Sequence, residues 1–216
     1  MASRRKIYFF ALWLILLLTN SLWATDFRII PGQRIGSITL GMSRQEVHRT
    51  LHAPNQVCRL RNGIIQESWL SRRKFSQADV ESGLYWKWNF VTVYFRLNQV
   101  AQVEVNSPHF TTSSKLSTRK SAIDWAKQFK PLRSTNYRRD RYDTGGYPGA
   151  KHFMVYDDAV KRGVAWRYGV WGDLAPEPNP NGPLEVVIIH RRRQPVILDP
   201  DGGNRFVRTS PDKHLR

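Results

Sequence analysis

The chain has 216 residues, with 34 Lys and Arg against 17 Asp and Glu, a net charge of +17 and one cysteine. Hydrophobic residues make up 41% and aromatic residues 12%, which excludes wholesale disorder, collagen-like repeats and coiled coils. One cysteine excludes both an intramolecular disulfide and a zinc site built from several cysteines. We therefore expect a folded protein with a basic surface that is held together by its core.

Residues 1–24 have the organisation of a secretory signal peptide. Basic residues 4–6 precede the 12 apolar residues 7–18, and a polar break then leads to the small residue Ala24. The apolar run is shorter than the ~20 residues that a membrane-spanning helix needs. Removal of the segment would leave 31 basic and 17 acidic residues, a net charge of +14. Because Leu22 is bulky for its place before the cut, an uncleaved inner-membrane anchor at residues 7–18 is the alternative.

Two segments 76 residues apart resemble each other weakly and suggest an internal duplication. Segments 39–47 and 116–123 each place a leucine at the end of an extended stretch, before a Ser or Thr that caps a short helix. In the first copy Ser43 and Glu46 have the spacing of a capping box. In this motif the side chain of each residue accepts a hydrogen bond from the backbone N–H of the other. The second copy has no glutamate at the matching position, so Thr118 is expected to cap its helix alone.

Strand-like runs with short connections follow each predicted helix. Their spacing disfavours βαβ units, and Asp157 and Asp158 are predicted to form a turn between two strands. The predicted fold class is therefore α+β, with two tandem helix-then-antiparallel-meander repeats whose helices pack on one face of the sheet. The predicted strands cover residues 64–70, 84–95, 100–105, 151–156, 163–168 and 184–190, the second and third forming a hairpin.

These elements divide the chain into four parts. The signal peptide at 1–24 is followed by a first α+β repeat at 25–107 and a second at 108–195. Residues 196–216 are predicted to be a flexible tail, because they offer little apolar area to offset the entropy of ordering.

A family resemblance rests on the first copy of the duplicated segment. The run at 35–43, with Glu46-Val47 and then His52-Ala53-Pro54, resembles the opening of a repeat in secreted bacterial proteins of the β-lactamase inhibitory protein type. The small lipoprotein subunit of the outer-membrane β-barrel assembly machinery opens similarly. The resemblance implies helices packed on an antiparallel sheet and, in the inhibitor, two such units whose sheets join into a concave partner-binding face. The chain lacks the inhibitor's disulfides and the lipoprotein's lipobox, so the likeness concerns fold more than role.

The polar residues match no known catalytic or metal-binding spacing. The sequence has no G-x-S-x-G, no phosphate-binding loop and no H-E-x-x-H. His48 and His52 could share a helix face, but no third ligand is near in sequence, which favours an exposed or capping pair over a metal site. Cys58 is interpreted as a buried or idle thiol, and His190 as a surface or hydrogen-bonded histidine. We therefore expect no catalytic residue, no metal and no cofactor, and hence no enzyme.

Aromatic residues alternate along two of the predicted strands. Residues 84–90 place their tryptophans on one face of a strand, and a second face of this kind occurs near residue 166. Such rings form either the core beneath the helices or exposed anchors of an interface, where Trp, Tyr and Arg are enriched. The predicted partner-binding residues are Trp86, Trp88, Trp166, Tyr168 and Trp171, with Arg191, Arg192 and Arg193 supplying an attractive field.

The excess of positive charge limits the class of partner. In a cytosolic protein it would indicate nucleic acid, but export disfavours that partner and leaves anionic lipids, envelope polymers or an acidic protein. A solvated surface without a specific partner is the alternative interpretation of the charge. We expect an exported, periplasmic or extracellular binding module that uses an aromatic sheet face with a basic rim to bind an acidic protein or anionic envelope component. The second hypothesis is a membrane-associated envelope structural or assembly factor held by uncleaved residues 7–18.

Overall fold

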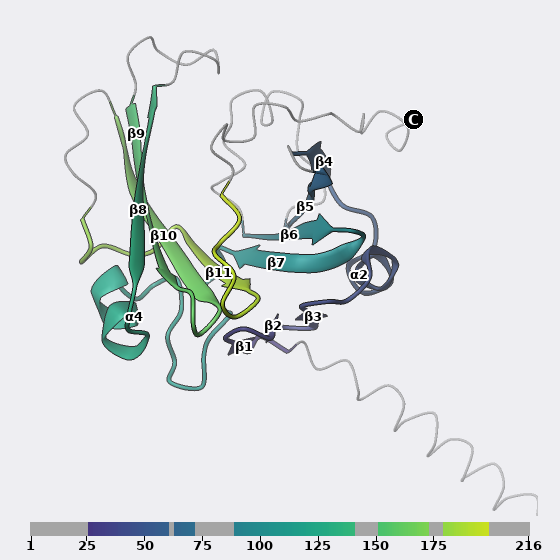
Figure 1. Ribbon diagram of the computed structural model, residues 1–216, viewed down its shortest axis with the longest axis horizontal. Helices are drawn as coiled ribbons and strands as arrows, with labels where there is room; N and C mark the ends of the chain where they lie inside the picture. The colour runs from purple at the N-terminus through teal and green to yellow at the C-terminus, as the bar shows by residue number, and fades with distance from the viewer. Residues whose placement is uncertain (1–25, 61–62, 72–88, 141–150, 173–178, 199–216) are drawn as a thin grey trace, which may run out of the picture.

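A computed structural model describes residues 26–60, 63–71, 89–140, 151–172 and 179–198 of the chain. These residues form a 3-stranded and an 8-stranded antiparallel sheet, together with two short helices (Figure 1). The small sheet has the order β1 (Ile29–Ile30), β2 (Arg34–Ile35), β3 (Ile38–Thr39). The large sheet has the order β4 (Gln56–Arg59), β5 (Ile65–Leu70), β6 (Phe90–Arg96), β7 (Gln99–Val105), β11 (Val186–His190), β10 (Val164–Gly172), β9 (Lys151–Ala159), β8 (Arg133–Asp140).

The large sheet is continuous across the predicted boundary at residue 107. Its two halves meet where β7 pairs with β11, with Val105 opposite Val187 and Val103 opposite Ile189. The run of β-branched residues in β11 suits a strand that is covered on both faces, whereas in β7 valines alternate with Gln102 and Glu104. The predicted hairpin is confirmed, because β6 and β7 pair through a two-residue turn at Leu97 and Asn98.

The first predicted helix and its cap are confirmed. Helix α2 (Arg44–Leu51) begins after Ser43, whose backbone N–H donates to Glu46 Oε2 at 2.8 Å. The Glu46 N–H donates in turn to Ser43 Oγ at 3.3 Å, which completes the capping box. No helix among the described ranges is long and apolar enough to cross a membrane.

The predicted cap of the second helix is wrong. Helix α4 (Ala122–Gln128) is capped by Ser121, whose Oγ accepts from Asp124 N at 3.2 Å, while Ser121 N donates to Asp124 Oδ2 at 3.4 Å. An aspartate at the third helical position thus closes a capping box as a glutamate does. Thr118 instead donates its hydroxyl to the carbonyl of Asn106 at 3.1 Å, in the segment that precedes the helix.

The apolar core lies on one face of the large sheet. Alternate residues of its strands point to this face, as the period of two in a strand requires. Helices α2 and α4 and the small sheet lie along this face (Figure 1). Their buried side chains belong to the same core cluster as those of the large sheet. Buried members include Val93, Val103, Val164, Val187 and Ile189 from the large sheet, Val47, Ala122 and Trp125 from the helices, and Ile29, Ile35 and Ile38 from the small sheet.

The predicted α+β fold class is wrong, because the described chain is mostly β. Helices α2 and α4 have 8 and 7 residues, and α2 buries only Val47. Helices of about two turns present too few core positions to form a layer over eight strands. Part of the cover comes instead from the small sheet, through three isoleucines that are each 2% exposed. The elements therefore form two antiparallel sheets with two short helices at the sides.

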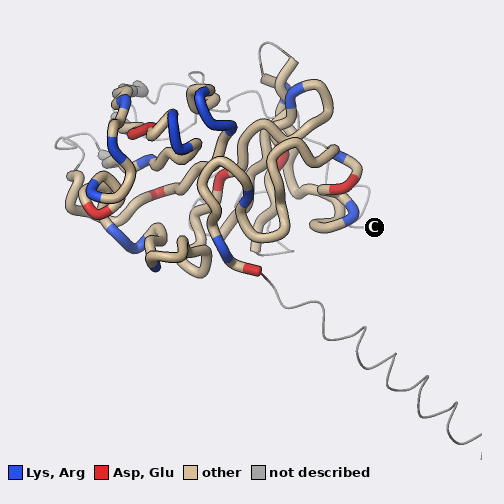
Figure 2. Tube along the Cα trace, turned by 60° about the horizontal axis from the view of Figure 1, so that its bottom comes forward, with Lys and Arg blue, Asp and Glu red and all other residues tan. Residues whose placement is uncertain are grey.

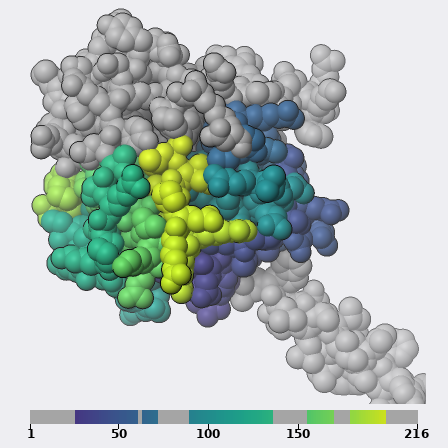
Figure 3. Space-filling view, viewed as in Figure 1, coloured from purple at the N-terminus to yellow at the C-terminus, as the bar shows by residue number. Residues whose placement is uncertain are grey.

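The opposite face of the large sheet carries polar side chains beside a smaller apolar cluster that includes Ile188 and Val196, and it is crossed by residues 194–198. The side chain of Gln102 accepts from Ile197 N at 2.6 Å and donates to Ile197 O at 3.1 Å, and Val196 N donates to Asp158 Oδ2 at 2.9 Å. Figure 3 shows this yellow segment running between the green and teal strands. The tail predicted to start at residue 196 therefore has its first residues packed on the sheet, with Val196 only 8% exposed.

The turn predicted at Asp157 and Asp158 is wrong, since both residues lie in β9 and are buried. Both carboxylates are hydrogen-bonded to side chains of other strands. Ser134 Oγ of β8 donates to Asp157 at 2.5 Å, and His190 Nε2 of β11 lies 2.9 Å from Asp158 Oδ1. The interpretation of His190 as a hydrogen-bonded histidine is confirmed. The chain turns a little later, at Gly163, where φ is +71°.

Candidate anion-binding surface

Three loops at one end of the large sheet bring basic residues from distant parts of the chain together. The loop after β11 contacts the β6–β7 turn, where Arg191 Nη2 donates to Gln99 Oε1 at 3.5 Å. It also contacts the β9–β10 turn, where the Arg193 amide donates to Val160 O at 2.8 Å. In Figure 3 the yellow, green and purple segments meet at this edge. We call the exposed cationic residues of these loops the basic end: Arg96, Lys161, Arg162, Arg191, Arg192 and Arg193.

Two glycines allow the loops to approach so closely. Gly32, in the β1–β2 turn, has φ +69°, and a Cβ atom there would lie 2.6 Å from Arg192 Cγ. A Cβ atom on Gly163 would lie 2.7 Å from the Gly32 Cα atom. The backbone hydrogen bond from Gly32 N to Gly163 O, 3.0 Å long, fixes the contact. The basic end is therefore positioned by backbone packing between the small sheet and the large one.

The positive charges of the basic end are not neutralised by neighbouring acids. Among the residues that the structure describes, no ion pair involves any of its six members. Three acids belong to adjoining segments, and all have other partners: Asp26 binds Arg28 and Arg34, Glu46 caps α2, and Asp158 is hydrogen-bonded to His190 and Val196. Figure 2 shows Lys and Arg outnumbering Asp and Glu along the trace. Exposed charges of one sign create an attractive field for an anion.

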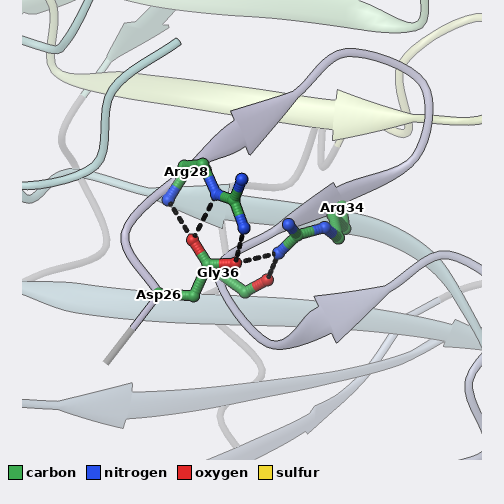
Figure 4. A network of polar contacts seen from close by, with 4 residues as sticks. All are labelled: Asp26, Arg28, Arg34 and Gly36. Atoms are coloured by element: carbon green, nitrogen blue, oxygen red, sulfur yellow. Dashed lines mark hydrogen bonds and ion pairs between the residues drawn. The ribbon is translucent and has the colours of Figure 1, made fainter. Parts of the chain in front are cut away.

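Asp26 anchors the start of the described chain to the small sheet (Figure 4). Arg28 Nε donates to Asp26 Oδ1 at 3.1 Å, and Arg34 Nη1 donates to Asp26 Oδ2 at 2.5 Å and also to the Gly36 carbonyl. The side-chain hydrogen bond from Arg28 is the main cause that holds the pKa of Asp26 well below its usual range, and its backbone amide and Arg34 add to it. The three side chains together carry a net charge of one positive unit.

The Asp26 contacts predict a pH-dependent effect of Asp26→Asn. A depressed pKa in the folded state contributes stability above the ordinary aspartate pKa of 3.8, and that stability is lost as the pH falls below it. We expect Asp26→Asn to lower the free energy of unfolding by at most about 1 kcal/mol at pH 7, because the pairs are partly exposed. Urea unfolding should show this difference shrinking between pH 4 and pH 2. An equal difference at pH 7 and pH 2 would contradict the assigned role.

Two of the predicted partner-binding aromatic residues are core residues instead, so that part of the prediction is wrong. The Trp166 side chain is 0% exposed, and its ring centroid lies 5.6 Å from that of Trp125 in α4. Tyr168, on the same face of β10, is 9% exposed, and burial, followed by the charge of Asp157, raises its pKa to about 12. The physical reason is that this face of β10 packs on the core beneath α4.

The other predicted partner-binding residues have different outcomes. Trp86 and Trp88 lie outside the described residues, and Trp171 belongs to β10 but its side chain is also outside what the structure describes. The predicted arginines at 191–193 are exposed and belong to the basic end. Of the basic end, Arg96, Lys161 and Arg162 were not predicted, because only the tertiary contacts between loops bring them next to residues 191–193.

A partly buried polar cluster on the opposite face of the sheet was also missed. Arg167 Nη1 donates to the Tyr156 hydroxyl at 3.1 Å, and Arg167 Nε donates to Glu185 Oε2 at 3.0 Å. Burial opposes the charge on Arg167, yet Tyr156, Glu185 and Glu104 raise its pKa well above the usual value. Burial, followed by the charge of Glu104, likewise raises the pKa of Tyr94. The alternation of polar residues in these strands was the only signal in the sequence.

The buried carboxylate of Glu67 accounts for the orientation of His48, the first of the two histidines at α2. Glu67, which is 0% exposed, accepts from Arg44 Nε at 2.7 Å and lies 2.6 Å from His48 Nε2. His48 is thus turned to a carboxylate on β5 rather than paired with His52 at a metal. Within the described ranges, no three His, Cys, Asp or Glu side chains are grouped as a metal site. Both clusters join strands or helices by ion pairs and contribute to the fold.

Comparison with known proteins found no family model, no curated protein and no solved structure that matches this chain. The resemblance to the β-lactamase inhibitory protein type therefore stays a prediction.

Proposed function

We propose that this protein is an exported, non-enzymatic binding module whose basic end binds an anionic partner. The observation that carries the proposal is the convergence of six exposed basic residues from three loops of the large sheet, with no ion pair among the described residues to neutralise them. Exposed like charges destabilise the folded chain unless an anion compensates them. Their concentration on one end is therefore best understood as a binding surface.

The sequence supports the remaining parts of the proposal. Residues 1–24 have the features of a signal peptide, and the exported chain would keep a net charge of +14. The buried carboxylate of Glu67 already has two partners on α2, Arg44 and His48. A binding role needs only the exposed charge and the rigid loops that present it. With Trp166 and Tyr168 in the core, charge replaces aromatic contact as the main source of attraction.

Replacing Arg191, Arg192 and Arg193 together with glutamine should weaken binding to a polyanion about 100-fold. The expectation follows from about 1 kcal/mol for each Lys or Arg near an anionic surface. The measurement is the dissociation constant of the full chain for heparin, a sulfated polysaccharide, at low and high salt. The wild-type affinity should fall with rising salt, and that of the triple variant should depend less on salt.

A matched control removes the same charge elsewhere. Arg119 and Lys120 precede α4, Lys127 lies in its last turn, and all three are exposed. The cap residue Ser121 of this helix bridges to Pro183, before β11 begins, whereas residues 191–193 follow the end of β11. Replacing these three with glutamine should weaken heparin binding severalfold less than the triple arginine variant does. Equal losses in the two variants would mean that net charge alone drives binding, and the proposed surface would be wrong.

A further inference from the structure

The tip of the β6–β7 hairpin carries an apolar side chain in an unfavourable place. Leu97 is 90% exposed, and its φ is +49°, followed by Asn98 at +61°. Two-residue hairpin turns of this kind favour Asn or Gly, because a positive φ crowds a larger side chain. Neither burial nor local conformation therefore accounts for a leucine here, and such a position indicates a role outside the folded chain.

Leu97 is adjacent to the basic end. Arg96 precedes it, and Gln99, two residues later, accepts a hydrogen bond from Arg191 at 3.5 Å. An apolar side chain that projects between cationic ones is the arrangement with which proteins enter the headgroup region of an anionic bilayer. The leucine reaches the acyl boundary while the guanidinium groups stay with the phosphates.

The path of the chain favours a membrane over an acidic protein as the partner. The described chain starts at Asp26, shortly after the apolar residues 7–18, and Arg34 links it to the β1–β2 turn. Gly32 in that turn lies against Arg192 of the basic end. The segment predicted to direct the chain to the membrane is therefore close in sequence to the turn that contacts the cationic surface. In a chain that kept this segment, the basic end would be held near the headgroups.

We propose that the basic end docks on an anionic phospholipid surface, with Leu97 inserted between the headgroups. The inference rests on the proposed function and specifies its partner as a lipid surface. It requires negative phosphate headgroups, since the cationic residues supply the attraction, and an accessible bilayer, since Leu97 supplies the insertion.

Vesicle co-sedimentation of the full chain tests the inference. Binding to vesicles of phosphatidylcholine with about one third phosphatidylglycerol is compared with binding to phosphatidylcholine alone, so that any contribution of residues 7–18 cancels. We expect a preference for the anionic vesicles, and Leu97→Asn should lower the affinity for these vesicles about tenfold, since leucine burial is lost. Asparagine suits the positive φ of the turn, so this variant keeps the hairpin. Heparin binding by Leu97→Asn should be unchanged.

A matched control uses another exposed apolar residue, Ile123, on α4. Ile123→Asn should bind anionic vesicles as the wild type does. No preference for anionic vesicles, or an unchanged affinity for them in Leu97→Asn, would overturn the inference. If heparin binding that depends on Arg191–Arg193 persisted in that case, the proposed function would stand and an acidic protein would be the partner. Loss of both would overturn the proposed function as well.

Discussion

Replacing Trp166 with alanine should lower the free energy of unfolding by about 3–5 kcal/mol. The ring is fully buried between Trp125 of α4 and the core face of β10, so its removal leaves a cavity in the largest cluster. For a chain of this size the melting temperature should fall by roughly 6–20 °C. Urea unfolding followed by circular dichroism, and calorimetry, give the two quantities.

Two comparison variants make this result specific. Trp166→Phe should cost much less, because the ring is largely kept and the buried indole N–H has no hydrogen-bond partner within the described chain. Leu97→Ala, at a residue that is 90% exposed, should change the unfolding free energy by no more than about 0.5 kcal/mol. A Trp166→Ala protein as stable as the wild type would contradict the placement of this ring in the core.

Replacing Arg167 with methionine should also lower the unfolding free energy by about 3–5 kcal/mol. The guanidinium group donates hydrogen bonds to the Tyr156 hydroxyl and to Glu185. Its positive charge also lies near the carboxylate of Glu104, which is 4% exposed. Without it, a buried carboxylate loses its nearby cation. Chemical denaturation of the single variant measures the loss.

A double-mutant cycle separates this electrostatic effect from packing. In the Arg167→Met background, Glu104→Gln should recover at least about 1 kcal/mol, because it removes the uncompensated charge. Arg119→Met, at an exposed arginine, should be nearly neutral. Additive effects of the two substitutions would show that Glu104 and Arg167 do not interact.

Several strands and one cap could be predicted from the sequence because their signals are local. The run at 64–70 is rich in isoleucine and tryptophan, as strands are, and matches β5, and Ser43 with Glu46 has the spacing of the observed capping box. The fold class could not be predicted, because the small sheet has strands of two residues, too short for a periodic signal. Its isoleucines cover part of the core that longer helices would otherwise have to cover.

The candidate site was predictable only in part. The arginines at 191–193 form a visible run, but Lys161 and Arg162 join them through contacts between loops that no local pattern shows. The alternation around Trp166 fits a core face and an exposed face equally well, and only the burial against Trp125 decides between them. The pairing of Asp158 with His190 joins residues 32 positions apart.

Hydrogen exchange of the full chain with and without heparin tests the proposed surface most directly. The account predicts that amide exchange slows in the loops at 96–99, 160–163 and 191–194, and that α4 is unaffected. Protection confined to α4 or to the outer strands β8 and β4, with no change in these three loops, would contradict the account.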